Sequence, residues 1–255
     1  VSDYVTKLAR ARTDIKYFIE EFLWIADKKG TFVPFKLWHE QAKIVQVAQE
    51  MYNRNKPIRL WIVKPRQIGS STVCAALVFW LAVFHDTYNC RVVAHKKDAS
   101  ANIFKHVRRF RDNFPFECML LPGEKSKTSV SFDTEFLLRL AAGDIPIIDP
   151  DEPPKAAIAA ASRIGIEVVS ETMGRSDTVQ VLWCSEFAHW VRGGKDLAPE
   201  AFGASRQTVP LAPETAIIIE STANGMGGMF HDGFWTAMRG ESEYEPIFFP
   251  WYEHH

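Results

Sequence analysis

The sequence has no excess of charge of either sign, because 30 lysines and arginines face 31 aspartates and glutamates and the formal net charge is −1. A nearly neutral chain has no overall electrostatic attraction to nucleic acid, so any such contact must come from a local patch. Cysteine is also scarce. The four cysteines, Cys74, Cys90, Cys118 and Cys184, are far apart and form no C-x-x-C motif. We therefore expect a reducing compartment with neither disulfides nor a cysteine-bound metal, and Cys74 and Cys184 as small core residues.

Long hydrophobic runs are missing as well. The longest, Val73–Phe84, is too short to span a bilayer and is better explained as a buried helix. We also expect no signal peptide, because the first residues do not have its pattern. These absences argue against a membrane as a partner.

Apolar residues, in contrast, are plentiful: 47% of the 255 residues are hydrophobic and 13% are aromatic. This length and composition suit one large α/β domain, or one domain with a small appended lobe. Short apolar runs alternate with helical patterns, which predicts a mostly parallel sheet with helices on both faces. The expected strands are Arg59–Val63, Cys90–Ala94, Ile164–Val169, Val179–Cys184 and Ala216–Glu220.

The helical patterns begin at the N-terminus, where apolar residues from Ile15 to Ile25 recur at helical spacing and predict a helical segment over residues 1–30. A hairpin across Asp133-Thr134 is predicted from two short apolar runs, 129–132 and 135–140. Residues 141–161, rich in proline, aspartate and alanine, are the least structured by composition. The other expected helices are Leu37–Tyr52, a helix from about Ser71, and Ala99–Phe114.

A phosphate-binding loop is the first motif that carries chemistry. After the predicted strand Arg59–Val63 the chain reads Lys64-Pro65-Arg66-Gln67-Ile68-Gly69-Ser70-Ser71-Thr72. The glycine allows a tight turn, and the backbone N–H groups of residues 69–72, at the start of a helix, can bind phosphate. The pattern departs from G-x-x-x-x-G-K-[ST] because Ser70 stands where the lysine is expected, and Lys64 can supply that charge from the start of the loop. On its own, the segment is equally well explained as an ordinary strand–turn–helix connection.

Two further polar segments follow predicted strands. Leu182-Trp183-Cys184-Ser185-Glu186 ends one strand with a carboxylate, and Ser221-Thr222-Ala223-Asn224-Gly225 follows another. Together with the loop, this order of motifs resembles the large terminase subunit family, the motors that package viral DNA. The resemblance runs from about residue 31 to the end. It implies an α/β P-loop NTPase of the ASCE type, with a central mostly parallel sheet, that hydrolyses ATP with Mg²⁺.

The resemblance implies roles for the residues around the phosphates. The loop from Lys64 to Thr72 would bind the β- and γ-phosphates, with Lys64 and Arg66 supplying positive charge and Ser71 ligating Mg²⁺. Glu186 would be the catalytic base. Ser185, which replaces the usual aspartate, would hold a metal-bound water. The alternative for Arg66 and Glu186 is a solvated surface charge.

Other implied roles lie further from the loop. Gln41 would pair with the adenine edge, and Phe35 or Trp38 would stack on the ring. An arginine finger would come from Arg175 or, alternatively, from Arg163, acting within the chain or on a neighbouring subunit. A structural ion pair is the competing explanation for both arginines. For Trp38, the competing explanation is a position in the core.

A coupling segment is implied at Ser221–Gly225. Ser221, Thr222 and Asn224 would sense the γ-phosphate and move the helix that follows. The competing explanation is a simple Asn-Gly turn.

A local basic patch is predicted in residues 91–111, where Asp98 is the only acid. Lys105, Arg108 and Arg109 are spaced so that they share one helix face. Such a face can bind DNA phosphates without reading sequence. A solvated basic face explains the same residues.

The resemblance also divides the chain and names its partners. It implies a helical lead-in with the adenine segment at residues 1–55, an ATPase core at 56–245, and at 246–255 the start of a linker to a nuclease domain that this sequence lacks. Double-stranded DNA, a portal protein and a small terminase subunit would be the partners of a homo-oligomeric ring. The ring would work in the host cell cytoplasm on a viral procapsid. Two alternatives stay open: another helicase-like nucleic-acid ATPase, and a non-catalytic nucleotide-binding or assembly module, which Ser70 and Ser185 favour because they replace charged residues.

Overall fold

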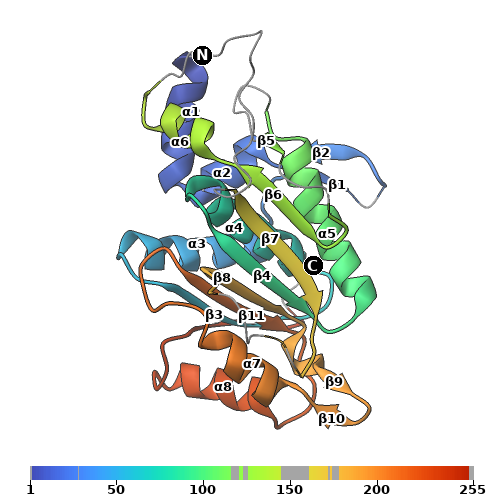
Figure 1. The fold of residues 1–255 in the computed structure, drawn as a ribbon. Coiled ribbons are helices and arrows are strands. Elements are labelled where there is room, and N and C mark those ends of the chain that lie inside the picture. The colour runs from blue at the N-terminus through green and yellow to red at the C-terminus, as the bar shows by residue number, and fades with distance from the viewer. Residues whose placement is uncertain are drawn as a thin grey trace.

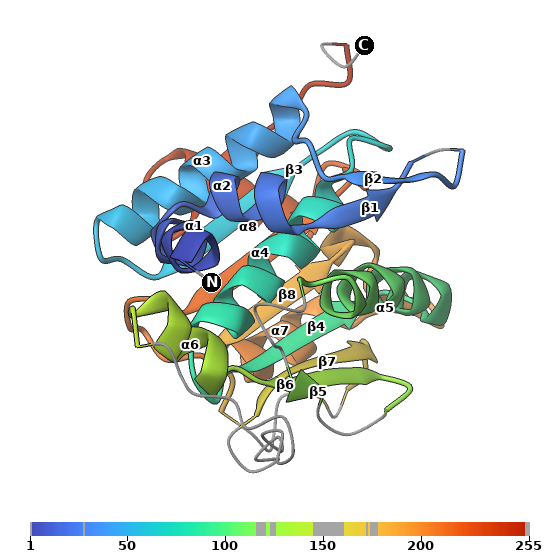
Figure 2. The ribbon, with the colours of Figure 1, turned by 90° about the horizontal axis from the view of Figure 1, so that it is seen from above.

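A central sheet organises the molecule (Figures 1 and 2). The computed structural model describes residues 2–27, 29–115, 121–122, 126–144, 161–171, 173 and 178–252. Within them, the sheet has eight strands. The first six in spatial order are parallel to one another, the seventh is antiparallel to the sixth, and the eighth is antiparallel to the seventh. In that order the strands are β12 (Glu245–Phe248), β3 (Ile58–Val63), β11 (Ala216–Ser221), β8 (Val181–Ser185), β4 (Asn89–Ala94), β7 (Ser162–Val168), β6 (Ser129–Asp133) and β5 (Leu121–Pro122). The predicted mostly parallel α/β fold is confirmed.

Helices cover the two faces of the sheet unequally. One face packs against α1 to α6 and the other against α7 and α8, each with its own cluster of buried apolar side chains (Figures 1 and 2). The larger layer surrounds α4, which is apolar on all sides and buried between the sheet and its neighbouring helices. The helices are α1 (Ser2–Thr13), α2 (Ile15–Phe22), α3 (His39–Asn53), α4 (Ser70–Phe84), α5 (Lys97–Asp112), α6 (Glu135–Ala141), α7 (Ala198–Arg206) and α8 (Met229–Met238).

Short elements complete the fold. A two-stranded ribbon precedes α3, another follows β8, and a 3₁₀ turn connects β8 to the second ribbon. These elements are β1 (Trp24–Ala26) with β2 (Phe32–Pro34), β9 (Val191–Arg192) with β10 (Lys195–Asp196), and η3 (Phe187–His189).

The order of the strands positions the functional residues. Strand β11 lies between β3 and β8 and pairs in parallel with both. Parallel strands present their carboxyl ends at the same edge of a sheet, and ligands of open α/β sheets bind at that edge. The residues that follow β3, β8 and β11 therefore meet there. The strand inserted between the loop strand and the acidic strand is the arrangement expected for an ASCE-type sheet.

Alternation along these strands sends side chains to opposite faces. On β11, Ala216 and Ile218 pack in the α4 cluster, whereas Ile217 and Ile219 pack in the cluster of α7 and α8. Trp183 of β8 likewise faces α4. The last residues of both strands in the same phase, Glu220 and Ser185, therefore lie on the α4 face.

Several expected element boundaries are wrong. The predicted N-terminal helical segment is two helices, because the side chain of Asp14 caps α2 by accepting a hydrogen bond from Tyr17 N, and Ile25 lies in β1. The predicted hairpin is a strand followed by α6. The predicted linker is wrong over residues 246–248, because β12 is an edge strand of the sheet and pairs with β3.

Other predictions hold or lie outside the described residues. Cys74 and Cys184 are buried and unpaired, as expected of small core residues. Cys118 and most of the proline-rich segment lie outside the described residues. In the part of the chain that the structure describes, no helix is both long and apolar enough to cross a bilayer.

Candidate functional site

The loop between β3 and α4 has the backbone of an anion-binding turn. Gln67 and Gly69 both have positive φ, at 67° and 70°. For a residue other than glycine such a φ is strained, and strain of this kind clusters at functional sites. Gly69 is the N-cap of α4, and no side chain caps this helix. The first N–H groups of α4 and the positive end of its dipole are thus available to an anion.

Gln41 holds the loop from behind. Its Nε2 donates to the carbonyl of Gly69 at 3.1 Å, and its Oε1 accepts from Trp38 N at 3.1 Å. The φ of Gly69 favours glycine, and a Cβ there would overlap Gln41 Nε2, so a larger residue would displace the Gln41 carboxamide. The carboxamide therefore fixes the start of α3 against the loop. Pairing of Gln41 with adenine stays a prediction.

Lys64 lies between two carboxylates. Its Nζ donates to Glu186 Oε1 at 2.7 Å and lies 3.1 Å from Glu220 Oε2. Lys64 is buried. Burial favours its neutral form, but Glu220 and Glu186 outweigh that effect and raise the pKa of Lys64. The lysine is therefore charged at neutral pH and oriented by acids, as the sequence prediction of a displaced loop lysine requires.

Glu186 follows β8 in a left-handed backbone conformation, with φ 50°. Besides Lys64, it accepts hydrogen bonds at Oε2 from Thr222 N and Thr222 Oγ1, both at 3.2 Å, and from Ser221 Oγ at 3.4 Å. Burial raises the pKa of Glu186, but Lys64 and the other donors outweigh it and hold the pKa below its usual range. The predicted strand-end acid and the predicted coupling segment thus meet directly.

Two histidines extend this network beyond the residues that the sequence singled out. His189 Nε2 lies 2.9 Å from Thr222 Oγ1, within hydrogen-bond distance, and the histidine tautomer decides which of the two atoms donates. His95 lies near His189, with ring centroids 6.2 Å apart, and burial lowers the pKa of His95. Their position after a strand end was the only sequence signal for either.

Glu220 is the main site residue that sequence reasoning missed. It is the penultimate residue of β11 and is 0% exposed. Its Oε1 accepts from Ser185 Oγ at 2.7 Å. Burial raises the pKa of Glu220 and Lys64 opposes that rise. A carboxylate at the end of the apolar run Ile217–Ile219 was the signal available in the sequence.

Lys64, Glu186 and Thr222 line a hollow of about 530 Å³, a size typical of small-molecule sites. Ser185, Glu220 and Gln41 are buried and do not line it. Cationic side chains and helix N–H groups dominate its wall, which suits a polyanion. Of the predicted loop residues, Pro65, Ile68 and Thr72 do not line it, and Ile68 is buried in the protein. The lining residues are Lys64, Arg66, Gln67, Gly69, Ser70, Ser71, His95, Lys96, Glu186, His189 and Thr222.

The two aromatic residues predicted to stack on adenine differ in their exposure to solvent. Phe35 is wrong for this role, because its ring is fully buried and stacks on Phe110 in the core. Trp38 is 48% exposed but does not line the hollow. Stacking of Trp38 on a nucleotide base stays a prediction.

The two arginine-finger alternatives lie away from this hollow or outside the described residues. Arg175 is outside the described residues. Arg163 is the second residue of β7, at the end of the strand opposite to the carboxyl edge, and therefore cannot reach the hollow of its own chain. It lines a separate polar depression with Arg91 and Glu167 on the sheet face that α4 does not cover. Action of either arginine on a neighbouring subunit stays a prediction.

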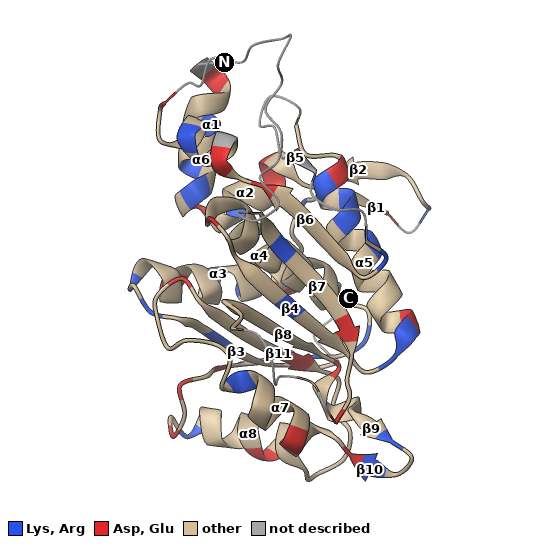
Figure 3. Cartoon of the chain, viewed as in Figure 1, with Lys and Arg blue, Asp and Glu red and all other residues tan. Residues whose placement is uncertain are grey.

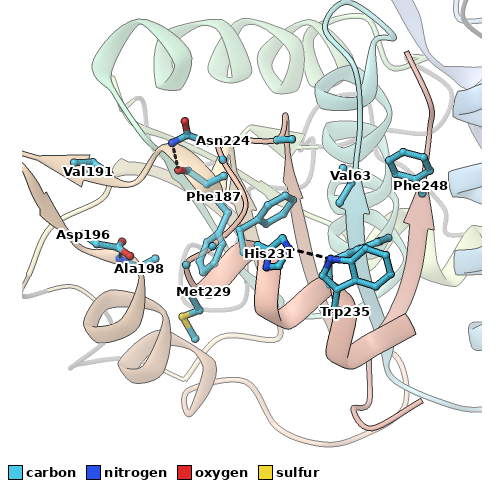
Figure 4. A pocket seen from close by; sticks show the side chains of 17 residues that line it. Val63, Phe187, Val191, Asp196, Ala198, Asn224, Met229, His231, Trp235 and Phe248 are labelled. Carbon is cyan, nitrogen blue, oxygen red and sulfur yellow. Dashed lines mark hydrogen bonds between the residues drawn. The ribbon is translucent and has the colours of Figure 1, made fainter. Parts of the chain in front are cut away.

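The coupling segment is tied to the residues after β8. Asn224 Nδ2 donates to the carbonyl of Ala188 at 2.9 Å, and α8 begins at Met229, shortly after the segment. A second hollow, of about 290 Å³, lies against this segment. Figure 4 shows Phe187 and Trp235 among the side chains that line it. It shares no lining residue with the hollow at the start of α4.

The predicted basic patch lies on the outer face of α5. Its inner face packs Ile103, Val107 and Phe110 into the core, which leaves Lys105 and Arg108 exposed. Figure 3 shows blue positions along α5. DNA binding by these residues and Arg109 stays a prediction.

Fold and site together define a class: a parallel α/β domain with a strand–loop–helix anion site facing an acid two strands away. Solved structures with a similar fold include phage large terminases. The chain matches the HK97 bacteriophage large terminase with a TM-score of 0.59 and 13% identity, over 92% of this chain and 43% of that one. It matches the Thermus phage P74-26 large terminase ATPase domain with a TM-score of 0.55 and 15% identity, over 84% and 81%.

The large terminase of another thermophilic bacteriophage, solved in complex with ADP, matches with a TM-score of 0.52 and 10% identity, over 84% of this chain and 45% of that one. The chain therefore has the fold of phage large terminase ATPase domains. It spans less than half of the HK97 terminase and of the terminase solved with ADP. Comparison of the sequence with family profiles and with curated proteins gives no match.

Proposed function

We propose that this chain is the ATPase motor domain of a viral DNA-packaging machine, which hydrolyses ATP and thereby moves double-stranded DNA into a procapsid. The observation that carries the proposal is the meeting of Lys64 and Glu186, 2.7 Å apart, on the wall of a cationic hollow at the start of α4. The fold supports it, because the similar structures are terminases and one was solved with ADP.

The residues present fit a bound Mg²⁺. No three His, Cys, Asp or Glu side chains of the described residues gather to hold a metal by themselves. Mg²⁺ in nucleotide sites needs only one or two protein oxygens, because phosphates and waters complete its shell. Ser71, which lines the hollow, would bind the ion with its hydroxyl. Ser185 is buried and does not line the hollow, so it would act only through a water. The ion would neutralise charge on the β- and γ-phosphate oxygens.

The lysine and the acid would act in sequence. Phosphate at the start of α4 offers Lys64 a stronger partner than Glu186, so the 2.7 Å contact would open when nucleotide binds. Freed from the lysine, Glu186 keeps the hydrogen bonds from Thr222 that orient it. Its burial then raises its basicity, which suits a group that orients water and accepts its proton.

Thr222 would report this change. It bonds the acid directly, and Asn224 bonds the turn that follows the acid. A shift of Glu186 on nucleotide binding would therefore move the segment that leads into α8. This connection supports the proposed coupling between hydrolysis and DNA movement, with Arg175 of a neighbouring subunit as the proposed finger. The ring, portal protein, small terminase subunit and cytoplasmic procapsid belong to the same proposal.

The proposal is tested by measuring ATP binding and turnover of the wild type, Lys64→Ala and Glu186→Ala at high protein concentration. We expect Lys64→Ala to weaken binding and Glu186→Ala to bind but not turn over. Lys195→Ala is a matched control, because Lys195 also pairs with two carboxylates, Glu171 and Glu200, but on the surface. Turnover of Glu186→Ala equal to that of the wild type would sink the catalytic assignment.

A non-catalytic nucleotide-binding module is the second candidate, and the uncharged Ser185 favours it. Binding without turnover in the wild type, even with DNA added and in the assembled ring, would support this interpretation. Turnover abolished by Glu186→Ala would reject it.

A further inference from the structure

Position 185 carries a serine instead of an acid, and a neighbouring carboxylate can supply the missing negative charge. P-loop NTPases use a strand-end aspartate beside the catalytic acid to hold Mg²⁺. Here Ser185 takes that place. Its hydroxyl donates to Glu220 Oε1 at 2.7 Å, and the two residues are direct partners in the register of β8 and β11.

Glu220 lies on the nucleotide side of the sheet. Ala216 and Ile218, which share its phase on β11, pack in the cluster of α4. Glu220 therefore points toward the face where the phosphate loop starts α4. Its other oxygen lies 3.1 Å from Lys64 Nζ.

Burial makes this carboxylate costly for folding alone. Glu220 is completely buried, and its Oε2 pairs with the Lys64 ammonium. A buried ion pair is often no more stabilising than an apolar residue of similar size, and the preceding residues of this strand are isoleucines. A functional demand on the charge explains why an acid stands here.

We infer that Glu220 is a positioning residue of the nucleotide site. It supplies the negative charge that Ser185 lacks, and it acts through its contacts with Ser185 and Lys64. The inference rests on the proposed function. Through its hydrogen bond with Ser185, Glu220 would make that hydroxyl oxygen a better acceptor for a water on the ion. Through its ion pair, Glu220 would hold Lys64 at the loop when Glu186 releases the lysine. The lysine and the acid of the usual motif are thus both present, but at other positions. The lysine is at the start of the loop, and the acid is on β11, between β3 and β8.

The test measures the affinity of a fluorescent ATP analogue with and without Mg²⁺, together with thermal unfolding. Glu220→Gln removes the charge and keeps the shape. We expect it to reduce the Mg²⁺-dependent gain in affinity by roughly 10–100-fold, the usual effect of losing a group behind a metal ligand. Glu243→Gln is the control, because Glu243 pairs with the buried Arg59 away from the site. It should leave the Mg²⁺ dependence unchanged.

A second variant, in which the carboxylate is moved to position 185, distinguishes loss of the charge from a structural defect. Ser185→Asp combined with Glu220→Gln returns the charge to the usual position and should restore the Mg²⁺ dependence. Wild-type Mg²⁺ dependence in Glu220→Gln, or no recovery in a folded double variant, overturns the inference and leaves the proposed function intact. A wild type that binds no nucleotide with Mg²⁺ overturns both.

Discussion

Replacing Gly69 with alanine changes the phosphate loop at the one point where backbone and side chain are both constrained. The φ of Gly69 is +70°, and an added Cβ would overlap Gln41 Nε2. The substitution therefore has two separable costs. The first is left-handed backbone strain, and the second is displacement of the Gln41 carboxamide from its bonds to Gly69 and Trp38.

The chain offers a control for each cost. Gly240 has the same φ of +70° but nothing near its Cβ position, so Gly240→Ala measures strain alone. We expect it to lower the free energy of unfolding by about 1 kcal/mol. Gly203 lies in α7 with open space and no positive φ, so Gly203→Ala should stabilise by about 0.5–1 kcal/mol.

Gly69→Ala should cost more than either control. Displacing Gln41 leaves a buried amide without partners, which adds about 1–3 kcal/mol to the strain. The total loss in the free energy of unfolding is then about 2–4 kcal/mol. Affinity for nucleotide should fall as well, because the loop can no longer close around phosphate.

A double-mutant cycle separates the two costs in urea unfolding. In a Gln41→Ala background the obstruction is gone, so Gly69→Ala should cost only as much as Gly240→Ala. The predicted coupling energy between positions 69 and 41 is about 1–3 kcal/mol. Equal costs of Gly69→Ala with and without Gln41 would refute the reasoning that the carboxamide supports the loop.

Three further changes probe other parts of the molecule. Gly233→Ala in α8 places a methyl group on the ring of Trp61 and should cost about 1–3 kcal/mol in urea unfolding, and an unchanged midpoint would contradict this packing. Burial lowers the pKa of His106 to about 4 from 6.5 in the unfolded chain, so stability falls as pH drops below 6.5. From pH 7 to pH 5 the wild type should lose about 2 kcal/mol more than His106→Gln, and parallel pH profiles would contradict this. Arg108→Glu with Arg109→Glu should weaken DNA binding and reduce its salt slope by about 2, and unchanged affinity and slope would exclude the patch as a DNA-binding surface.

The sequence allowed the parallel core to be predicted because its strands are continuous apolar runs. Such runs are typical of strands buried on both faces, and β3, β8 and β11 are of this kind. The edge strand β12 could not be found this way. It has only four residues, of which Ile247 alone is buried.

Short apolar runs were also the source of the wrong hairpin. The run from Glu135 to Leu140 fits a strand as well as a helix by periodicity alone. The structure resolves the ambiguity, because Leu137 and Leu140 face the core one helical turn apart and Asp133 accepts from Glu135 N at 2.9 Å.

At the site, the order of motifs predicted Lys64, Glu186 and the Thr222 segment, which the structure brings together. It could not predict Glu220 as their neighbour. That placement depends on which strand lies between β3 and β8, a property of the sheet rather than of any local pattern. Phe35, one of the two aromatics proposed for adenine, failed for a similar reason, because its ring stacks in the core on Phe110, which is far away in the sequence.

The central claim is that Lys64 serves as the phosphate-binding lysine of the loop. The most direct measurement is a crystal structure with Mg²⁺ and a non-hydrolysable ATP analogue. We predict Lys64 Nζ about 3 Å from a γ-phosphate oxygen, with its contact to Glu186 broken. Lys64 still bonded to Glu186, with the triphosphate bound by other residues, would contradict it.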